Sequence, residues 1–169
     1  MEKTSNLLLP DPPNPKWAKL LMDYDFRSEE NLLKFISRIW PFIWRFEWHF
    51  GRLQLHEVEI RKTEHGWHFY VTLQQQLKPE DIAYLQLALG SDYKRECFNW
   101  RRVRLKLFKD WNVLYREKFD ERDRLVSKEG ERLTELENEV RRIIDEARKV
   151  ILQRAQNQVE NSSASSTGK

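Results

Sequence analysis

The sequence predicts an α+β fold, in which a βαββαβ sheet carries helices on one face and a long amphipathic helix follows it. Three observations lead to this prediction. Apolar and polar residues alternate with a period of two in residues 19–26 and 58–73, and apolar residues between these stretches follow a helical period. Apolar residues after residue 130 recur in heptads.

The composition indicates one domain with an appendage. The chain has 169 residues, of which 12% are aromatic, and this is enough to build a sizeable core. Its net charge of +3 is too small to indicate nucleic acid by itself. The single cysteine, Cys97, excludes an intrachain disulfide and is typical of a reducing compartment. Because no stretch has the roughly 18 apolar residues of a membrane span, we expect a cytoplasmic protein with no membrane partner.

The first part of the chain predicts an arm, a strand and two helical pieces. Residues 1–16 hold four of the six prolines and are expected to form an extended arm. The alternating residues 17–26 predict the first strand. Ser28 can cap the helix that follows. Pro41 interrupts this helix, and Gly51 ends the helical piece after it.

Residues 58–73 predict a β-hairpin. In both arms apolar residues alternate with polar ones, so each arm has one buried and one open face. The polar connection between the arms, residues 63–66, ends in Gly66, which can supply a positive φ angle.

Two more helices and a last strand complete the predicted sheet. The first helix has Pro79 in its first turn and ends at Gly90, and the second covers residues 93–103. Residues 111–115 alternate again and predict a fourth strand. The resulting order of strand, helix, two strands, helix and strand is that of a ferredoxin-like or RRM-like sheet, with helices on one face and the other face open.

The chain changes character after the sheet domain, residues 17–118. Residues 119–156 are expected to form a C-terminal helix, and its firm part, about residues 131–156, follows Gly130. Residues 157–169 are expected to form a disordered tail. Because a heptad seam of large apolar residues is stabilised by burial, we expect this helix either to pair in a homodimer or to brace the domain, and its length favours the homodimer. The seam consists of Leu133, Leu136, Val140, Ile143, Ala147 and Val150.

Acidic residues of the first strand and a histidine of the hairpin suggest a site. Asp23 and Asp25 lie two residues apart and project from the strand face that His68 shares. Two such carboxylates can hold a pair of Mg²⁺ or Mn²⁺ ions. Asp110 is expected as the third metal ligand, because it has the parity of the polar residues in the fourth strand, and Glu57 and Glu59 on the open face of the hairpin are alternatives. A basic patch for nucleic acid is supplied by Lys94, Arg95, Arg101, Arg102 and Arg104.

Two of these motifs resemble those of the archaeo-eukaryotic primase superfamily, which includes plasmid and viral primase-polymerases. The first motif is the strand Leu21-Met-Asp-Tyr-Asp-Phe26, and the second is the hairpin Arg61-Lys-Thr-Glu-His-Gly-Trp-His68. The resemblance covers about residues 17–118.

The resemblance implies a catalytic site for nucleotidyl transfer. Asp23 and Asp25 would bind the catalytic Mg²⁺ or Mn²⁺ ions, and His68 would contact the triphosphate of the incoming nucleotide. The residues implied to bind the nucleotide are Arg61, Lys62, Thr63 and His68. The chain would then be a minimal primase-polymerase-like protein of DNA replication, with nucleic acid, nucleotides and replication proteins as partners.

An alternative function of another class uses the same fold. Glu64 and His65 stand where the family has Ser-Gly, and this departure favours a catalytically inactive nucleic-acid-binding or assembly subunit. Zinc binding by His65 and His68 lacks ligand spacing. A rolling-circle nickase with Tyr84 or Tyr93 as nucleophile would need two histidines that flank one residue, whereas two residues separate His65 from His68.

Overall fold

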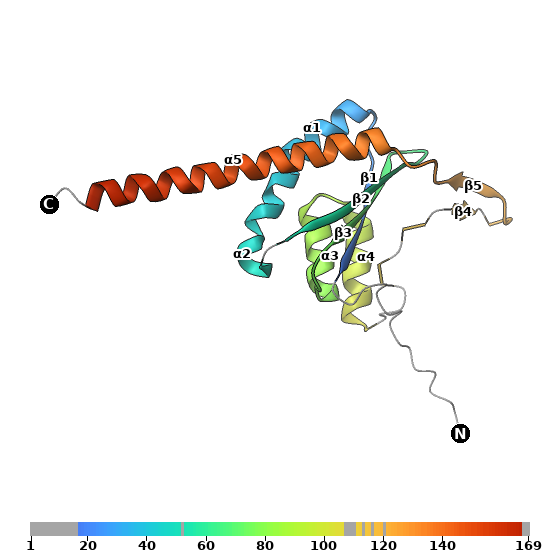
Figure 1. The fold of residues 1–169 in the computed structure, drawn as a ribbon. Helices are drawn as coiled ribbons and strands as arrows, with labels where there is room; N and C mark the ends of the chain where they lie inside the picture. The colour runs from blue at the N-terminus through green and yellow to red at the C-terminus, as the bar shows by residue number, and fades with distance from the viewer. Residues whose placement is uncertain are drawn as a thin grey trace, which may run out of the picture.

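The computed structural model describes residues 17–51, 53–106, 111–112, 114–115, 117–119 and 121–166. It is a mixed α+β structure with a three-stranded antiparallel sheet and a long C-terminal helix (Figure 1). No helix in these ranges is long and apolar enough to cross a membrane. In chain order the elements are β1 (Ala18–Tyr24), α1 (Glu29–Ile39), the 3-10 helix η1 (Trp40–Arg45), α2 (Glu47–Phe50), β2 (Leu55–Lys62), β3 (Trp67–Leu73), α3 (Pro79–Ala88), α4 (Tyr93–Arg104), β4 (Glu117–Phe119), β5 (Leu125–Lys128) and α5 (Thr134–Ser166).

Strand β3 lies in the middle of the sheet, and β1 and β2 pair antiparallel to it on either side. The first strand and the hairpin predicted from the sequence are therefore confirmed. In this register His68 lies opposite Asp23 of β1 and opposite Arg61 of β2. Residues of the other parity, such as Phe69 and Ile60, are buried in the core.

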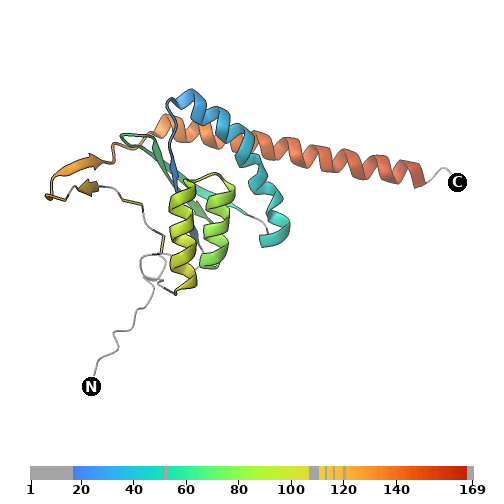
Figure 2. The same ribbon diagram turned by 180° about the vertical axis from the view of Figure 1, so that it is seen from behind.

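The core lies between one face of the sheet and helices α1, α3 and α5 (Figures 1 and 2). Helix α1 is capped by Ser28 as predicted, since the Ser28 side chain accepts a hydrogen bond of 3.3 Å from the Asn31 N–H. The hydroxyl of Tyr24 links β1 to the end of α3 by donating to the Leu89 carbonyl at 2.9 Å. Burial raises the pKa of the Tyr24 hydroxyl, so it stays protonated and keeps this bond.

Gly66 is required in the hairpin turn for space and not for its φ angle. Positive φ angles among the described glycines occur at Gly51 and Gly90, so the prediction for Gly66 was wrong. A Cβ atom on Gly66 would lie 1.9 Å from the carbonyl oxygen of Tyr24. Thr63 closes the turn, because its side chain accepts a 2.9 Å hydrogen bond from the Gly66 N–H. The turn can thus lie directly against β1.

The outer edge of β1 is bound by groups from α3, α4 and the turn between them. The predicted fourth strand at residues 111–115 was wrong, and the described residues of that stretch belong to no strand. The groups on β1 that a fourth strand would pair with already have partners. These bonds run from Leu21 N to Gln86 Oε1 (2.8 Å), Asp23 N to Ser91 Oγ (3.1 Å), Arg95 Nη1 to Leu21 O (2.6 Å) and Asp92 N to Asp23 O (2.9 Å).

A second hairpin, formed by β4 and β5, precedes the C-terminal helix. Helix α5 begins at Thr134, close to the start near residue 131 that was predicted for its firm part, while the outer boundary at residue 119 was wrong. Two backbone bonds fasten the connecting residues to the outer edge of β2: Gly130 N donates to Lys62 O, and Leu133 N to Ile60 O, both at 2.8 Å.

The far end of α5 also differs from prediction. The helix continues to Ser166, through most of the predicted disordered tail of residues 157–169. The sequence between residues 131 and 166 contains no glycine or proline to end a helix.

The first part of α5 braces the domain. Leu136, Val140 and Ile144 are buried in the core, and Trp44 Nε1 donates to the Ile144 carbonyl at 3.2 Å. The Glu137 carboxylate accepts a bond of 2.9 Å from the Ile60 N–H at the edge of β2. This half of the helix therefore performs the bracing role that was one of the two predicted alternatives.

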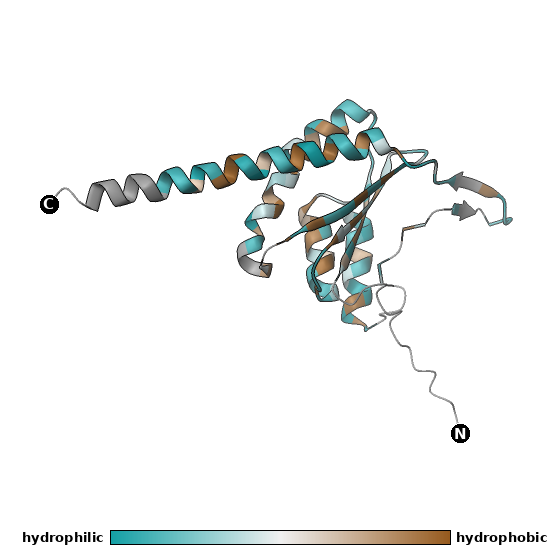
Figure 3. Cartoon of the chain, viewed as in Figure 1, coloured by the Kyte–Doolittle hydropathy of each residue, from teal (hydrophilic) through white to brown (hydrophobic). Residues whose placement is uncertain are grey.

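The remainder of α5 leaves the domain (Figures 1 and 2). Hydrophobic residues continue along the helix beyond its crossing with α1 (Figure 3). Val150 and Leu152 are about half exposed there, at 47% and 53%. Pairing of two chains through this part of the helix stays a prediction.

Candidate functional site

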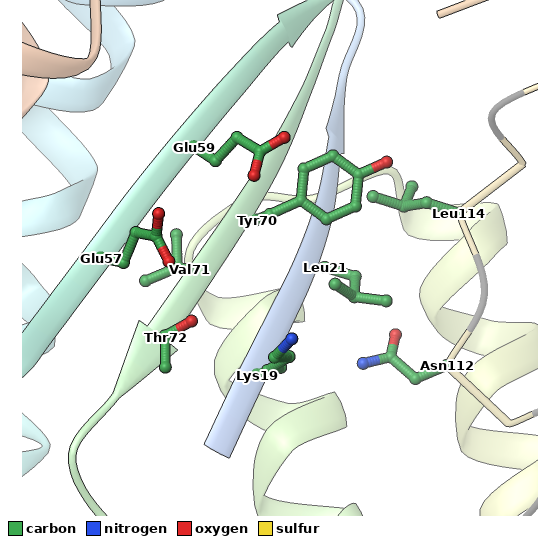
Figure 4. A pocket seen from close by; sticks show the side chains of 9 residues that line it. All are labelled: Lys19, Leu21, Glu57, Glu59, Tyr70, Val71, Thr72, Asn112 and Leu114. Atoms are coloured by element: carbon green, nitrogen blue, oxygen red, sulfur yellow. The ribbon is translucent and has the colours of Figure 1, made fainter. Parts of the chain in front are cut away.

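The open face of the sheet carries polar side chains in rows across the three strands. One row joins Asp23, His68 and Arg61 through the strand register. The next rows contain Tyr70 beside Glu59, and Thr72 beside Glu57. The side chains of these last two rows line a cavity of about 360 Å³, together with Lys19 and Leu21 of β1 and with Asn112 and Leu114 from the segment after α4 (Figure 4).

His68 is buried on this face, between two carboxylates. Its Nδ1 lies 2.7 Å from Glu129 Oε1, and its Nε2 lies 3.7 Å from Asp23 Oδ1. An ionised carboxylate can only accept a hydrogen bond, so Nδ1 is the donor of this bond when Glu129 is ionised. The predicted proximity of Asp23 and His68 is therefore present, while Glu129 is a partner that was not predicted. Its position between β5 and α5 gave no sequence signal that it would return to the sheet.

The predicted nucleotide-binding residues of the hairpin contact groups of the protein itself. Arg61 Nε lies 2.5 Å from Glu59 Oε1 and 3.6 Å from Glu129 Oε2. The Glu59 carboxylate raises the pKa of the Arg61 guanidinium, so its charge is held by an acidic neighbour. The Lys62 ammonium lies 3.5 Å from the centre of the Trp67 ring, and Thr63 closes the turn.

The predicted metal ligands do not converge among the described residues. Asp23 lines a cavity of about 220 Å³ that His68 also lines, whereas Asp25 lies beyond the end of β1 and lines a different cavity with residues of α1. Asp110, the predicted third ligand, lies outside the described residues. No group of three or more histidine, cysteine or acidic residues in the described ranges could hold a metal ion. The described side chains therefore do not fit a two-metal site.

Arg95 belongs to a buried polar network and not to the basic surface. Its guanidinium donates to Leu21 O, to Asn112 Oδ1 at 2.9 Å and to the Glu96 carboxylate. Burial lowers the pKa of Arg95, an effect that the Glu96 charge opposes. Glu96 is itself 2% exposed and accepts from Ser91 Oγ at 2.8 Å. These contacts hold α4 against β1, and the contact of Arg95 with nucleic acid stays a prediction.

The outer surface of α4 combines aromatic and basic side chains. We define it by Tyr93, Lys94, Phe98, Trp100, Arg101 and Arg104, all of which are exposed. Phe98 and Trp100 are 60% and 43% exposed, which is unusual for large aromatic rings. The only acid within α4, Glu96, is buried, so the outer surface is purely basic. Arg101 and Arg104 also lie in the last helical turn, where positive charge suits the helix dipole.

A shallow cavity connects this helix with the sheet site. Phe98 and Arg102 of α4 line the 220 Å³ cavity together with Asp23 and His68. Leu114 and Tyr115 line it from the segment after α4, and Tyr115 is 59% exposed. Arg102, a predicted nucleic-acid contact, thus lies between the outer α4 surface and the polar face of the sheet.

The basic residues of α4 were predicted from the sequence, but the exposure of its aromatic rings was not. Helix α4 buries polar residues, Glu96 and Asn99, and exposes Phe98 and Trp100. Because the usual rule places aromatic residues inside, the exposure of these rings follows only from the contacts that α4 makes with α3 and β1.

Comparison with models of known protein families, with curated proteins and with solved structures finds no match for this chain.

Proposed function

We propose that this protein binds single-stranded nucleic acid through the outer surface of α4. The observation that carries the proposal is that exposed aromatic rings and basic side chains alternate on one helix. Phe98 and Trp100 lie among Lys94, Arg101 and Arg104. This is the binding function that the sequence offered as the alternative to catalysis.

The basic side chains of α4 supply attraction to the phosphate backbone of the nucleic acid. Lys94, Arg101 and Arg104 form no ion pair within the part of the chain that the structure describes. Each basic side chain that contacts a phosphate releases counterions from the nucleic acid, so the affinity is expected to fall as the salt concentration rises. Because the net charge of the whole chain is only +3, the attraction is expected to depend on local basic surfaces such as this one.

The rings decide between single and double strands. An exposed aromatic side chain gains roughly 1–3 kcal/mol by stacking on an unpaired base. The faces of paired bases are covered by their neighbours in a duplex, so they offer no such contact. A surface that combines exposed aromatic rings with basic side chains is therefore suited to unpaired nucleotides.

Replacing one ring should weaken binding without affecting the fold. We expect Phe98→Ala to raise the Kd for a labelled single-stranded oligonucleotide by about 5- to 150-fold, the equivalent of the stacking energy. Fluorescence anisotropy at fixed salt measures the change. Phe42→Ala is a matched control, because Phe42 is an exposed phenylalanine of η1, on a different element. Equal affinity of the wild type and the Phe98→Ala variant, or equal losses in both variants, would contradict the proposal.

Nucleotidyl transfer is a second candidate, favoured by the proximity of Asp23 to His68 on the open face. Two observations count against it. Asp25 lines another cavity, and the carboxylate of Glu129 already lies within hydrogen-bond distance of His68 Nδ1. If the chain synthesises primers from labelled nucleotides with Mn²⁺, Asp23→Ala should reduce product formation at least about 100-fold, because removing a catalytic group costs several kcal/mol. Full activity of the Asp23→Ala chain would remove this candidate and leave the binding function.

A further inference from the structure

Three side chains of the sheet converge on one carboxylate that comes from outside the sheet. His68 Nδ1 and Tyr70 Oη lie 2.7 and 2.5 Å from Glu129 Oε1. Arg61 Nε lies 3.6 Å from Glu129 Oε2. The Glu129 side chain is only 5% exposed, so its charge depends on these partners in place of water.

The donors and the acceptor differ in how they are held. His68 and Tyr70 lie in the central strand β3, and Arg61 lies opposite His68 in β2, so the strand register fixes all three. Glu129 lies in the connection between β5 and α5. The nearest backbone bond of that connection joins Gly130 to Lys62. The donor set is thus part of the rigid sheet, while the carboxylate is brought to it by a connecting segment.

We propose that His68, Tyr70 and Arg61 form a binding site for a carboxylate group, and that Glu129 is its internal ligand. When the Glu129 side chain is absent or withdrawn, a small free carboxylate, or an acidic group of another molecule, takes its place. The site lies on the sheet and is distinct from the outer α4 surface, so it does not depend on the proposed nucleic-acid binding.

The acidic residues around the site favour a ligand with a single negative charge over a dianion. Glu59 remains paired with Arg61 at 2.5 Å, and Asp23 lies 3.7 Å from the other nitrogen of His68. These two acids disfavour a dianion, since like charges at short range repel strongly where water is scarce. The site is therefore expected to prefer formate or acetate over phosphate, in contrast to the nucleotide triphosphate that the sequence resemblance implies for His68.

Rescue of a Glu129→Ala chain by formate tests the site. We expect this chain to melt below the wild type, because His68 and Tyr70 lose their shared hydrogen-bond partner and Arg61 loses an ion-pair partner. Sodium formate at 100 mM should raise its melting temperature by at least about 3 °C over the same concentration of sodium chloride, since a ligand that binds only the folded state stabilises it. The wild type should show no such difference, and phosphate at equal ionic strength should give a smaller rise.

Two variants make the outcome decisive. Tyr70→Phe/Glu129→Ala lacks one donor and should lose most of the formate effect. Glu64→Ala removes an exposed glutamate of the hairpin turn and should show no formate effect at all. If the Glu129→Ala chain is unfolded in chloride, formate is expected to restore its folded circular dichroism spectrum. Equal behaviour in formate and chloride, or an equal rise in the double variant, would overturn the proposal.

Discussion

Replacing Arg95 by alanine is expected to destabilise the protein by about 3–5 kcal/mol, the usual cost of removing one partner of a buried ion pair. The Glu96 carboxylate, which is 1% exposed as a side chain, would then be left with neutral donors only. The bond from Arg95 to the Leu21 carbonyl would also be lost. Urea unfolding followed by tryptophan fluorescence measures the change as a lower midpoint.

Two further variants separate the buried charge from other effects of the substitution. Arg101→Ala removes an exposed arginine of the same helix and should change stability by no more than about 0.5 kcal/mol. Arg95→Met/Glu96→Gln removes both charges while keeping most of the volume, and should recover part of the loss. A loss below about 1 kcal/mol for Arg95→Ala would show that the pair does not hold α4 to the sheet.

Replacing Leu136 by alanine is expected to cost about 2–5 kcal/mol, because it leaves a cavity where α5 enters the core. Leu136 is 4% exposed in this position. Leu152→Ala is the matched control on the same helix, since Leu152 is 53% exposed beyond the domain and should leave the unfolding midpoint unchanged. Similar midpoints for the two variants would contradict the bracing role of α5.

The same pair of variants addresses self-association. If two chains pair through the projecting part of α5, sedimentation equilibrium will show a concentration-dependent dimer that Leu152→Ala weakens. A monomer at all concentrations would leave bracing as the function of α5 and remove the predicted homodimer.

Elements with local signals were predictable from the sequence. The strand β1 and the hairpin follow from alternation, and the start of α1 follows from Ser28, whose partner Asn31 is three residues away. The firm part of α5 was predicted from about residue 131, three residues before its start at Thr134. The outer boundary at residue 119 was wrong because the heptad spacing, which Val126 shares by chance, continues back into residues that form β5.

Features that depend on distant partners were not predictable. Gln86 replaces a strand at the edge of β1 by bonding Leu21, which lies 65 residues earlier. Glu129 reaches His68 across 61 residues. A charged residue such as Arg95 is predicted from sequence to lie on the surface, because its burial is favourable only when the matching acid and carbonyl groups are in place. The candidate site is for this reason less predictable than the fold.

The closed edges of the sheet determine how other molecules can approach it. The amide and carbonyl groups of β1 at Leu21 and Asp23, and those of β2 at Ile60, already have partners within the chain. An extended peptide therefore finds no template for adding a strand at these positions, and a second copy cannot join the sheet edge to edge there. At these positions the sheet should resist the edge-to-edge pairing that leads to fibrils in concentrated solution.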